Sequence, residues 1–328
     1  MSRRKRGRPY VYSPTVILRC FIVRIWFRLD SNNTLHTFLM MDYQYNRKLA
    51  LACGLVSIPC RRTFDRRLKT ISTDIKERIS TMGNLFVTKE LVDPSITAID
   101  SALLKAKGHA WHISSMKKGI VPRPGIDTDA RWGYSHTKGW IFGYKLHLTS
   151  SSTTTTTTSS AVAGGGGGKE IIVPLTADVT TANVPDNKMY IPLTSSSSVF
   201  SLPSALYIIA DSGYDAKKLY DYSKNTLGID LICPVKRYKS TSKERLELIC
   251  FYESEIGQAI YSRRRISIEP LIEHIKSSFR IDQLPARGFQ AVSAIVLLSV
   301  LLYQIMVYYN CKKDEPNPKS IKYMLGTW

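Results

Sequence analysis

The pattern of apolar and polar residues in the first quarter of the chain is helical. Residues 15–29 and 34–43 carry apolar side chains three or four positions apart, and few glycines or prolines interrupt them. Two shorter helical segments, residues 47–55 and 61–71, lie on either side of a turn at residues 56–59. This pair has the form of a helix-turn-helix, in which the second helix enters the major groove of DNA. An ordinary basic helix on a helical bundle explains the pattern equally well.

From residue 93 the pattern changes to strands, with helices between the later ones. The predicted strands are residues 95–100, 140–149, 170–178, 205–211 and 230–235, and the predicted helices are residues 217–227, 267–279 and a long C-terminal run. Three strands in succession, followed by alternating strands and helices, indicate an α/β fold with a mixed sheet and helices on both faces. We therefore expect a helical region at residues 1–92, an α/β domain at residues 93–310 and a tail at residues 311–328.

Two kinds of segment within the α/β region stand out by composition. Residues 150–168 are almost entirely Ser, Thr, Ala and Gly and predict a flexible low-complexity loop, of which residues 194–201 are a smaller example. Residues 291–309 carry no charge and approach the length of a membrane span. A helix buried in the α/β core is the favoured interpretation, because a single span would leave Gln304 without a polar partner. We therefore expect no membrane association.

The charge balance indicates a polyanionic partner. The chain of 328 residues has 46 Lys and Arg against 26 Asp and Glu, a formal net charge of +20. Residues 1–92 hold 18 of the basic and 6 of the acidic residues. Clustered Lys and Arg favour nucleic acid, because neutralising phosphates releases counterions; a membrane surface and a generally basic, solvated surface are the alternatives. Six cysteines without a Cys-x2-Cys pair argue against a zinc finger or a disulfide framework and fit a reducing, cytoplasmic setting.

Three carboxylates are the candidate chemical groups. Asp100 and Asp211 each end a predicted apolar strand, where ligands gather in α/β folds. Glu269 is expected at the start of a helix that Ser267 caps and in which Pro270 occupies the first turn. Taken singly, each aspartate is more often structural, and the arginines at positions 263–265 are ordinary surface partners for a glutamate. Together the three oxygen donors suit Mg²⁺ or Mn²⁺, and two such ions roughly 3.5–4 Å apart would clamp a reacting phosphodiester.

Seven segments between about residues 5 and 305 occur in the order found in a known family. They are RGRP, IPCRRTFDRRL, AIDSALLKAKG, GIDTDARWGYSHTKGWIFGYKLHL, TANVPD, IIADSGYD and RRRISIEPLIEHIKSSF. They resemble the DDE transposases of prokaryotic insertion sequences, which have a ribonuclease-H-like catalytic domain and the signature Tyr-x2-Arg-x3-Glu-x6-Lys. Arg265, Glu269 and Lys276 fit this spacing, whereas Tyr261 lies one residue too far upstream. His147 also matches a family position, although a structural histidine is the favoured interpretation.

The resemblance implies a reaction and a set of partners. Asp100, Asp211 and Glu269 would hold two catalytic Mg²⁺ or Mn²⁺ ions. Water would attack the transposon end, and the freed 3′-hydroxyl would attack target DNA without a covalent enzyme intermediate. Arg265 and Lys276 would contact DNA phosphates beside the metals. Double-stranded DNA would be the partner, a homodimer would form in the DNA complex, and the protein would act in the cytoplasm of a prokaryote, at the nucleoid.

The basic residues of the second helix-turn-helix segment are the candidates for recognition of the transposon ends. They are Arg61, Arg62, Arg66 and Arg67. Two other functions remain open: a domesticated, non-catalytic DNA-binding protein, and a metal-dependent nuclease of the same fold. A third alternative, a membrane-anchored basic protein, depends only on residues 291–309. The presence of all three carboxylates argues against the non-catalytic protein.

Overall fold

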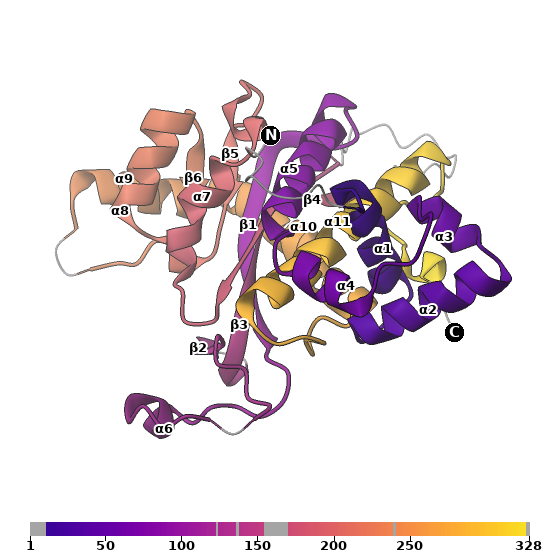
Figure 1. Ribbon diagram of the computed structural model, residues 1–328. Helices are drawn as coiled ribbons and strands as arrows, with labels where there is room; N and C mark the ends of the chain where they lie inside the picture. The colour runs from indigo at the N-terminus through magenta and orange to yellow at the C-terminus, as the bar shows by residue number, and fades with distance from the viewer. Residues whose placement is uncertain (1–10, 123, 136–137, 154–169, 239–240, 326–328) are drawn as a thin grey trace.

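The computed structural model describes residues 11–122, 124–135, 138–153, 170–238 and 241–325 (Figure 1). The RGRP segment and most of the low-complexity loop predicted at residues 150–168 lie outside the described residues. The first three positions of that predicted loop, 150–152, belong instead to a strand. The smaller predicted loop at residues 194–201 contains a 3-10 helix, η2 (Ser198–Ser201), in which Val199 and Phe200 are buried.

The N-terminal region is helical, as expected. Its helices are α1 (Pro14–Trp26), α2 (Asn32–Tyr45), α3 (Lys48–Cys53), α4 (Arg61–Leu68) and α5 (Ser72–Thr88). Ser13 and Ser31 cap α1 and α2, because each side chain accepts a hydrogen bond from the backbone N–H three residues later. Helix α3 ends at Gly54 with φ +78°, a left-handed conformation that glycine adopts without strain.

The centre of the molecule is a six-stranded mixed sheet. Its strands are β1 (Asp93–Lys105), β2 (Arg131–Ser135), β3 (Gly139–Ser152), β4 (Ile172–Thr181), β5 (Tyr207–Ile209) and β6 (Asp230–Ile232). Strand β3 pairs antiparallel with β1 along one edge and with β2 and then β4 along the other. Strands β5 and β6 continue the sheet parallel to β1. The order β4-β3-β1-β5-β6 is that of the expected ribonuclease-H-like sheet, with β2 as an unpredicted addition.

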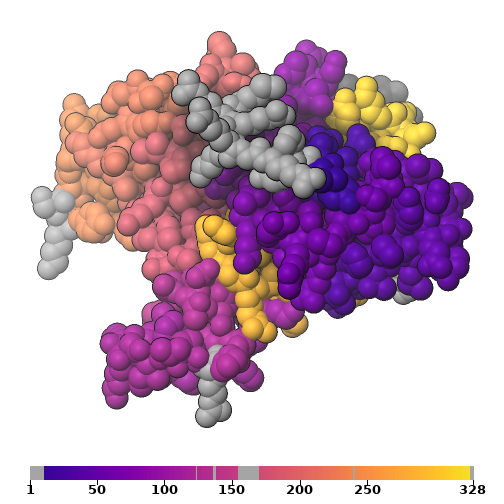
Figure 2. All heavy atoms as spheres, viewed as in Figure 1, coloured from indigo at the N-terminus to yellow at the C-terminus, as the bar shows by residue number. Residues whose placement is uncertain are grey.

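Helices flank this sheet. They include α7 (Tyr190–Thr194), α8 (Lys217–Tyr222), α9 (Lys243–Glu253), α10 (Glu255–Phe279) and α11 (Phe289–Lys312). Helices α5 and α11 pack on each other and on β4, and α10 lies against β1 and β3. A short helix, α6 (Ile113–Lys117), projects with its neighbouring chain from the body of the molecule (Figures 1 and 2).

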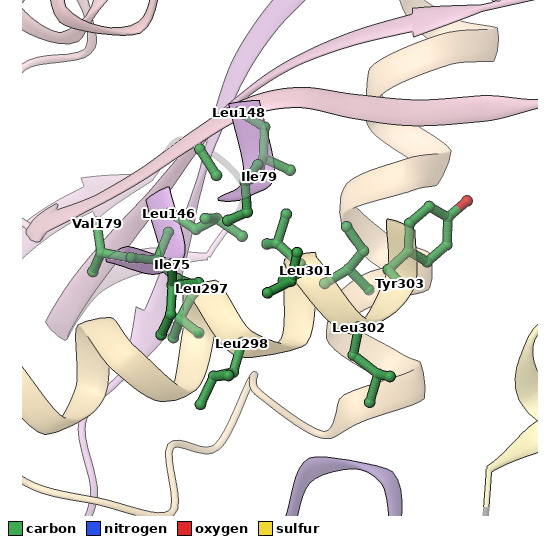
Figure 3. Close-up of a cluster of buried hydrophobic side chains, with 14 of the residues drawn as sticks. Ile75, Ile79, Leu146, Leu148, Val179, Leu297, Leu298, Leu301, Leu302 and Tyr303 are labelled. Carbon is green, nitrogen blue, oxygen red and sulfur yellow. The ribbon is translucent and has the colours of Figure 1, made fainter. Parts of the chain in front are cut away.

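The apolar C-terminal segment is a core helix. Among the described residues, α11 is the one helix long and apolar enough to cross a membrane, but 89% of the 18-residue apolar window within it is buried inside the protein. Figure 3 shows Leu297 and Leu301 of α11 gathered with Ile75 of α5 and Leu146 of β3. The buried Gln304 side chain donates hydrogen bonds to the carbonyls of Ile79 and Pro174, as the buried-helix prediction requires.

The N-terminal helices belong to the same core. One continuous set of buried apolar residues extends from Ile17 on α1 to Leu325 near the C-terminus. Helices α1 and α4 both contact α11. The described part of the predicted tail, residues 311–325, is also packed, since α11 runs on to Lys312 and Asn310 donates a hydrogen bond to the carbonyl of Pro318.

Helix α10 corrects one expectation. We expected a helix starting at Ser267, but α10 begins at Glu255, after the cap Ser254, and Pro270 lies inside it. The Ser267 hydroxyl instead donates to the carbonyl of Arg263 within the helix. A proline inside a helix leaves the carbonyl four residues earlier without its usual partner. That residue is Ile266, which is 54% exposed, so water can reach its side of the helix.

Candidate active site

Asp100 lies in the middle of β1 and not at its end. The strand continues to Lys105 because residues 101–105 remain paired with β3. The Asp100 carboxylate accepts hydrogen bonds from the backbone N–H of Ser101 at 2.8 Å and from Nη2 of Arg264 at 2.6 Å. Burial raises the pKa of Asp100 to about 6, although Arg264 lowers it, and nearby Asp211 and Asp186 raise it further.

Asp211 follows β5 directly, where the sequence predicts it. Its side chain caps the 3-10 helix η3 (Ser212–Tyr214) by accepting a hydrogen bond from the N–H of Gly213 at 2.9 Å. Burial raises the pKa of Asp211, whereas the Gly213 bond and the positive charge of Arg264 lower it. Asp211 therefore lies within electrostatic range of both Asp100 and Arg264.

Glu269 reaches the same place from α10. Its Oε1 accepts a hydrogen bond from Nη1 of Arg264 at 2.6 Å. Arg264 thus links Asp100 on β1 to Glu269 on α10 through the two ends of one guanidinium group. The Asp100 and Arg264 side chains are 14% and 15% exposed, whereas Glu269 is 47% exposed. The structure therefore brings the three predicted carboxylates to one region, which opens to solvent on the side of α10.

Arg264 was not among the predicted site residues. The spacing Arg-x3-Glu selects Arg265, yet the structure places Arg264 against the carboxylates and leaves Arg265 exposed on α10. Tyr261 and Arg264 have the Tyr-x2-Arg spacing of the family signature, so the extra residue lies between the arginine and the glutamate. Three consecutive arginines share one local context, and only the packing of α10 distinguishes them.

The remaining predicted DNA-binding residues lie in two places. Lys276 is 4% exposed, and its amine contacts Glu273 at 2.7 Å, which lowers the pKa of Glu273. On α4, Arg62 and Arg66 are exposed, Arg61 forms an exposed ion pair with Asp65 at 3.6 Å, and Arg67 is half-buried. Their contacts with DNA stay predictions.

A fourth carboxylate, Asp186, was missed. It follows β4 and accepts hydrogen bonds from the hydroxyl of Ser101 at 2.7 Å and from the amine of Lys145 at 2.9 Å. Nδ1 of His147 lies 3.7 Å from the same oxygen, and Nε2 is 2.8 Å from the hydroxyl of Thr180. Burial lowers the pKa of His147 to about 4, so the ring is neutral at pH 7, and its structural role stays a prediction. The sequence signal was available, because Asp186 ends the TANVPD segment.

The donor chemistry of this region fits a hard divalent cation. All the candidate ligands are carboxylate oxygens, which Mg²⁺ and Mn²⁺ prefer. Among the described residues, however, no three His, Cys, Asp or Glu side chains are grouped closely enough to hold a metal ion. The positive charge between Asp100 and Glu269 is supplied by Arg264.

Comparison with known proteins identifies the family to which the chain belongs. The family model described as "Transposase DDE domain" matches residues 92–305. The chain therefore belongs to the DDE transposase family and is a DNA transposase, and members of this family generally use divalent metal ions. The matched part excludes residues 5–91, which our sequence resemblance had included.

Two solved structures are distantly similar. The chain is 10% identical to "Mos1 transposase paired-end complex with left transposon end", covering 93% of this chain and 80% of that chain with a TM-score of 0.21. It is also 10% identical to "Crystal structure of a pre-cleavage Mos1 transpososome", covering 92% and 80% with a TM-score of 0.20. No curated protein matches the sequence significantly.

Proposed function

We propose that this transposase cleaves the ends of its transposon and joins the 3′-hydroxyl ends to target DNA, with Asp100, Asp211 and Glu269 holding two Mg²⁺ or Mn²⁺ ions. The observation that supports this most directly is the bridge made by Arg264. One guanidinium contacts Asp100 and Glu269, which come from distant parts of the sequence, and it interacts with Asp211. Carboxylates gathered around one cationic group form a site whose charge suits a bound cation.

The proposed chemistry is a pair of phosphoryl transfers. Bound divalent ions would polarise the phosphate and stabilise the charge on the attacking and leaving oxygens. In the first transfer, water attacks the phosphodiester at the transposon end and a 3′-hydroxyl leaves. In the second, that hydroxyl attacks a target phosphodiester and displaces another 3′-oxygen. Arg265, exposed on α10, would pair with the DNA phosphates. Lys276, which is 4% exposed, would do so after its amine leaves Glu273.

Recognition of the ends is assigned to α4. Phe64 and Leu68 of this helix are buried, and the Phe64 ring packs on Phe21 with centroids 5.9 Å apart. The opposite side of α4 exposes Arg61, Arg62 and Arg66, so a helix anchored by its apolar side presents arginines outward. Arginine is the residue that most often reads guanine edges in the major groove.

We also propose a homodimer on DNA and action in the cytoplasm at the nucleoid, without membrane attachment because α11 is buried.

Substitution of Asp100 by Asn tests the catalytic assignment. The amide keeps the size of the side chain but removes its charge, so Asp100→Asn should abolish Mg²⁺-dependent cleavage of DNA carrying the element's own ends while leaving DNA binding within about twofold. Asp221→Asn, which removes an exposed carboxylate on α8, is the charge-matched control and should cleave normally.

Three results would contradict the proposal. An equal loss of DNA binding by Asp100→Asn would show that Asp100 is structural, and retained cleavage would show that it is not catalytic. Cleavage by the native protein without joining of 3′-ends would favour a nuclease of the same fold. Chelation of divalent ions with EDTA should stop both reactions, and added Mg²⁺ should restore them.

A further inference from the structure

Arg264 holds an unusual position for an arginine in an acidic site. Its side chain is mostly buried, and it forms two 2.6 Å hydrogen bonds, one to Oδ2 of Asp100 and one to Oε1 of Glu269. Its third nitrogen, Nε, is buried and has no hydrogen-bond partner among the described residues. Both side-chain hydrogen bonds of Arg264 therefore go to the two carboxylates.

The charge of the surrounding groups explains why a cation lies there. Asp100, Asp211 and Asp186 interact electrostatically around this point, and Glu269 joins them through Arg264. The cationic partners of these carboxylates are Arg264 and Lys145. Lys145 is held by Asp186, which leaves Arg264 as the counter-ion of Asp100 and Glu269. A buried carboxylate without a counter-ion is costly, so the metal-free protein is stabilised by this arginine.

We propose that Arg264 is a built-in competitor for the divalent metal ions: its guanidinium occupies the oxygens of Asp100 and Glu269 that a shared ion needs, and it must move away before the ion binds. This inference rests on the proposed metal-dependent function. An oxygen at roughly 2.0–2.1 Å from Mg²⁺ cannot use the same lone pair to accept a short hydrogen bond. The free energy needed to release Arg264 therefore lowers the apparent affinity for metal. The same reduction occurs whenever the binding-competent state of a protein is only a minor one.

The alternative role for Arg264 is to position the carboxylates. In that case its bridge would hold Asp100 and Glu269 in the geometry that the metal requires, and its removal would weaken metal binding. The two roles predict opposite signs for the same measurement, so metal affinity in the absence of DNA distinguishes them without any assay of activity.

The experiment measures binding of Mn²⁺ to the full-length, metal-free protein by calorimetry at pH 8. Arg264→Gln removes the charge, and we expect the Kd for Mn²⁺ to fall by at least about fivefold, the lower end of typical coupling between two binding events. Arg264→Lys keeps a point charge that cannot span both carboxylates, so its Kd should lie between those of Arg264→Gln and the native protein. Arg263→Gln makes the same change of charge one position earlier on α10 and should bind Mn²⁺ within about twofold of the native protein.

Several outcomes decide the proposal. Equal or weaker Mn²⁺ binding by both Arg264 variants would overturn it in favour of the positioning role. A matching gain in Arg263→Gln would also overturn it, since general electrostatics would then explain the effect. If Arg264→Gln fails to fold by circular dichroism, Arg264→Lys, which retains one ion pair, decides alone. Absence of Mn²⁺ binding to the native protein and to every variant would contradict the proposed metal site itself and not merely the competition.

Discussion

Acidification should lower the free energy of unfolding, because the buried His147 ring resists protonation. Its side chain is fully buried, and burial lowers its pKa from 6.5 to about 4, although Asp186 opposes this shift and Lys145 adds to it. The unfolded chain therefore takes up a proton near pH 6.5, whereas the folded chain resists until about pH 4. Stability from the neutral ring is complete above pH 6.5 and is lost as the pH falls toward 4. At 1.36 kcal/mol per pKa unit, the loss at pH 4.5 is about 2–3 kcal/mol.

Asp100 contributes with the opposite sign, so the effect must be measured as a difference. The pKa of Asp100 is raised to about 6, which means that its contribution to stability falls as the pH rises through the range from 4 to 6. We would measure urea unfolding from pH 4.5 to 7.5 for the native protein, His147→Gln, and His109→Gln as an exposed control. Relative to His147→Gln, the native protein should lose about 2–3 kcal/mol on going from pH 7 to 4.5. A flat difference between these two proteins would refute the buried neutral histidine.

Two further predictions concern packing and recognition. Gly83→Ala should lower the free energy of unfolding by about 1–3 kcal/mol, because a Cβ at this position of α5 would lie 2.5 Å from the carbonyl oxygen of Leu175 on β4; native stability in urea would contradict this close contact. Arg62→Ala or Arg66→Ala should weaken binding to the element's ends by about 1–3 kcal/mol in a gel-shift titration, with little effect on unrelated DNA if the side chain reads a base. An equal loss on both DNAs would indicate a phosphate contact instead.

Much of the fold could be predicted because its local signals agree with its packing. Regular apolar spacing places α1 and α2 within a few residues of their observed ends. The longer strands are apolar runs, and they were found for the same reason. Strand β2 was missed because its five residues, RWGYS, contain a central glycine and are mostly half-buried or exposed. Helix α9 was missed because it buries only Ile249 and so shows no apolar face.

Only those residues of the candidate site that strand and helix patterns indicate could be predicted. Asp100 and Asp211 were chosen as candidate site residues because each follows an apolar run. Strand β1 nevertheless continues beyond Asp100, because residues 101–105 still pair with β3. Arg264 was missed because only the packing of α10 distinguishes it from the arginines beside it. Asp186 was missed because its contact with Ser101 joins elements far apart in the sequence, although the residue ends the TANVPD segment. The start of α10 was misplaced for a related reason, because tertiary packing holds Pro270 within a helix that propensity alone would end.

The shared core changes how DNA recognition can be separated from catalysis. The predicted boundary at residue 92 suggests removing residues 1–92 and asking whether end recognition is lost. Such a fragment would also lack α5, whose buried Ile75, Ile79 and Phe86 pack with α11 and β4. It would therefore expose α11, the most apolar helix of the chain, and a loss of binding could follow from misfolding alone. Substitutions at the exposed arginines of α4 leave this core intact, so they separate recognition from stability where truncation does not.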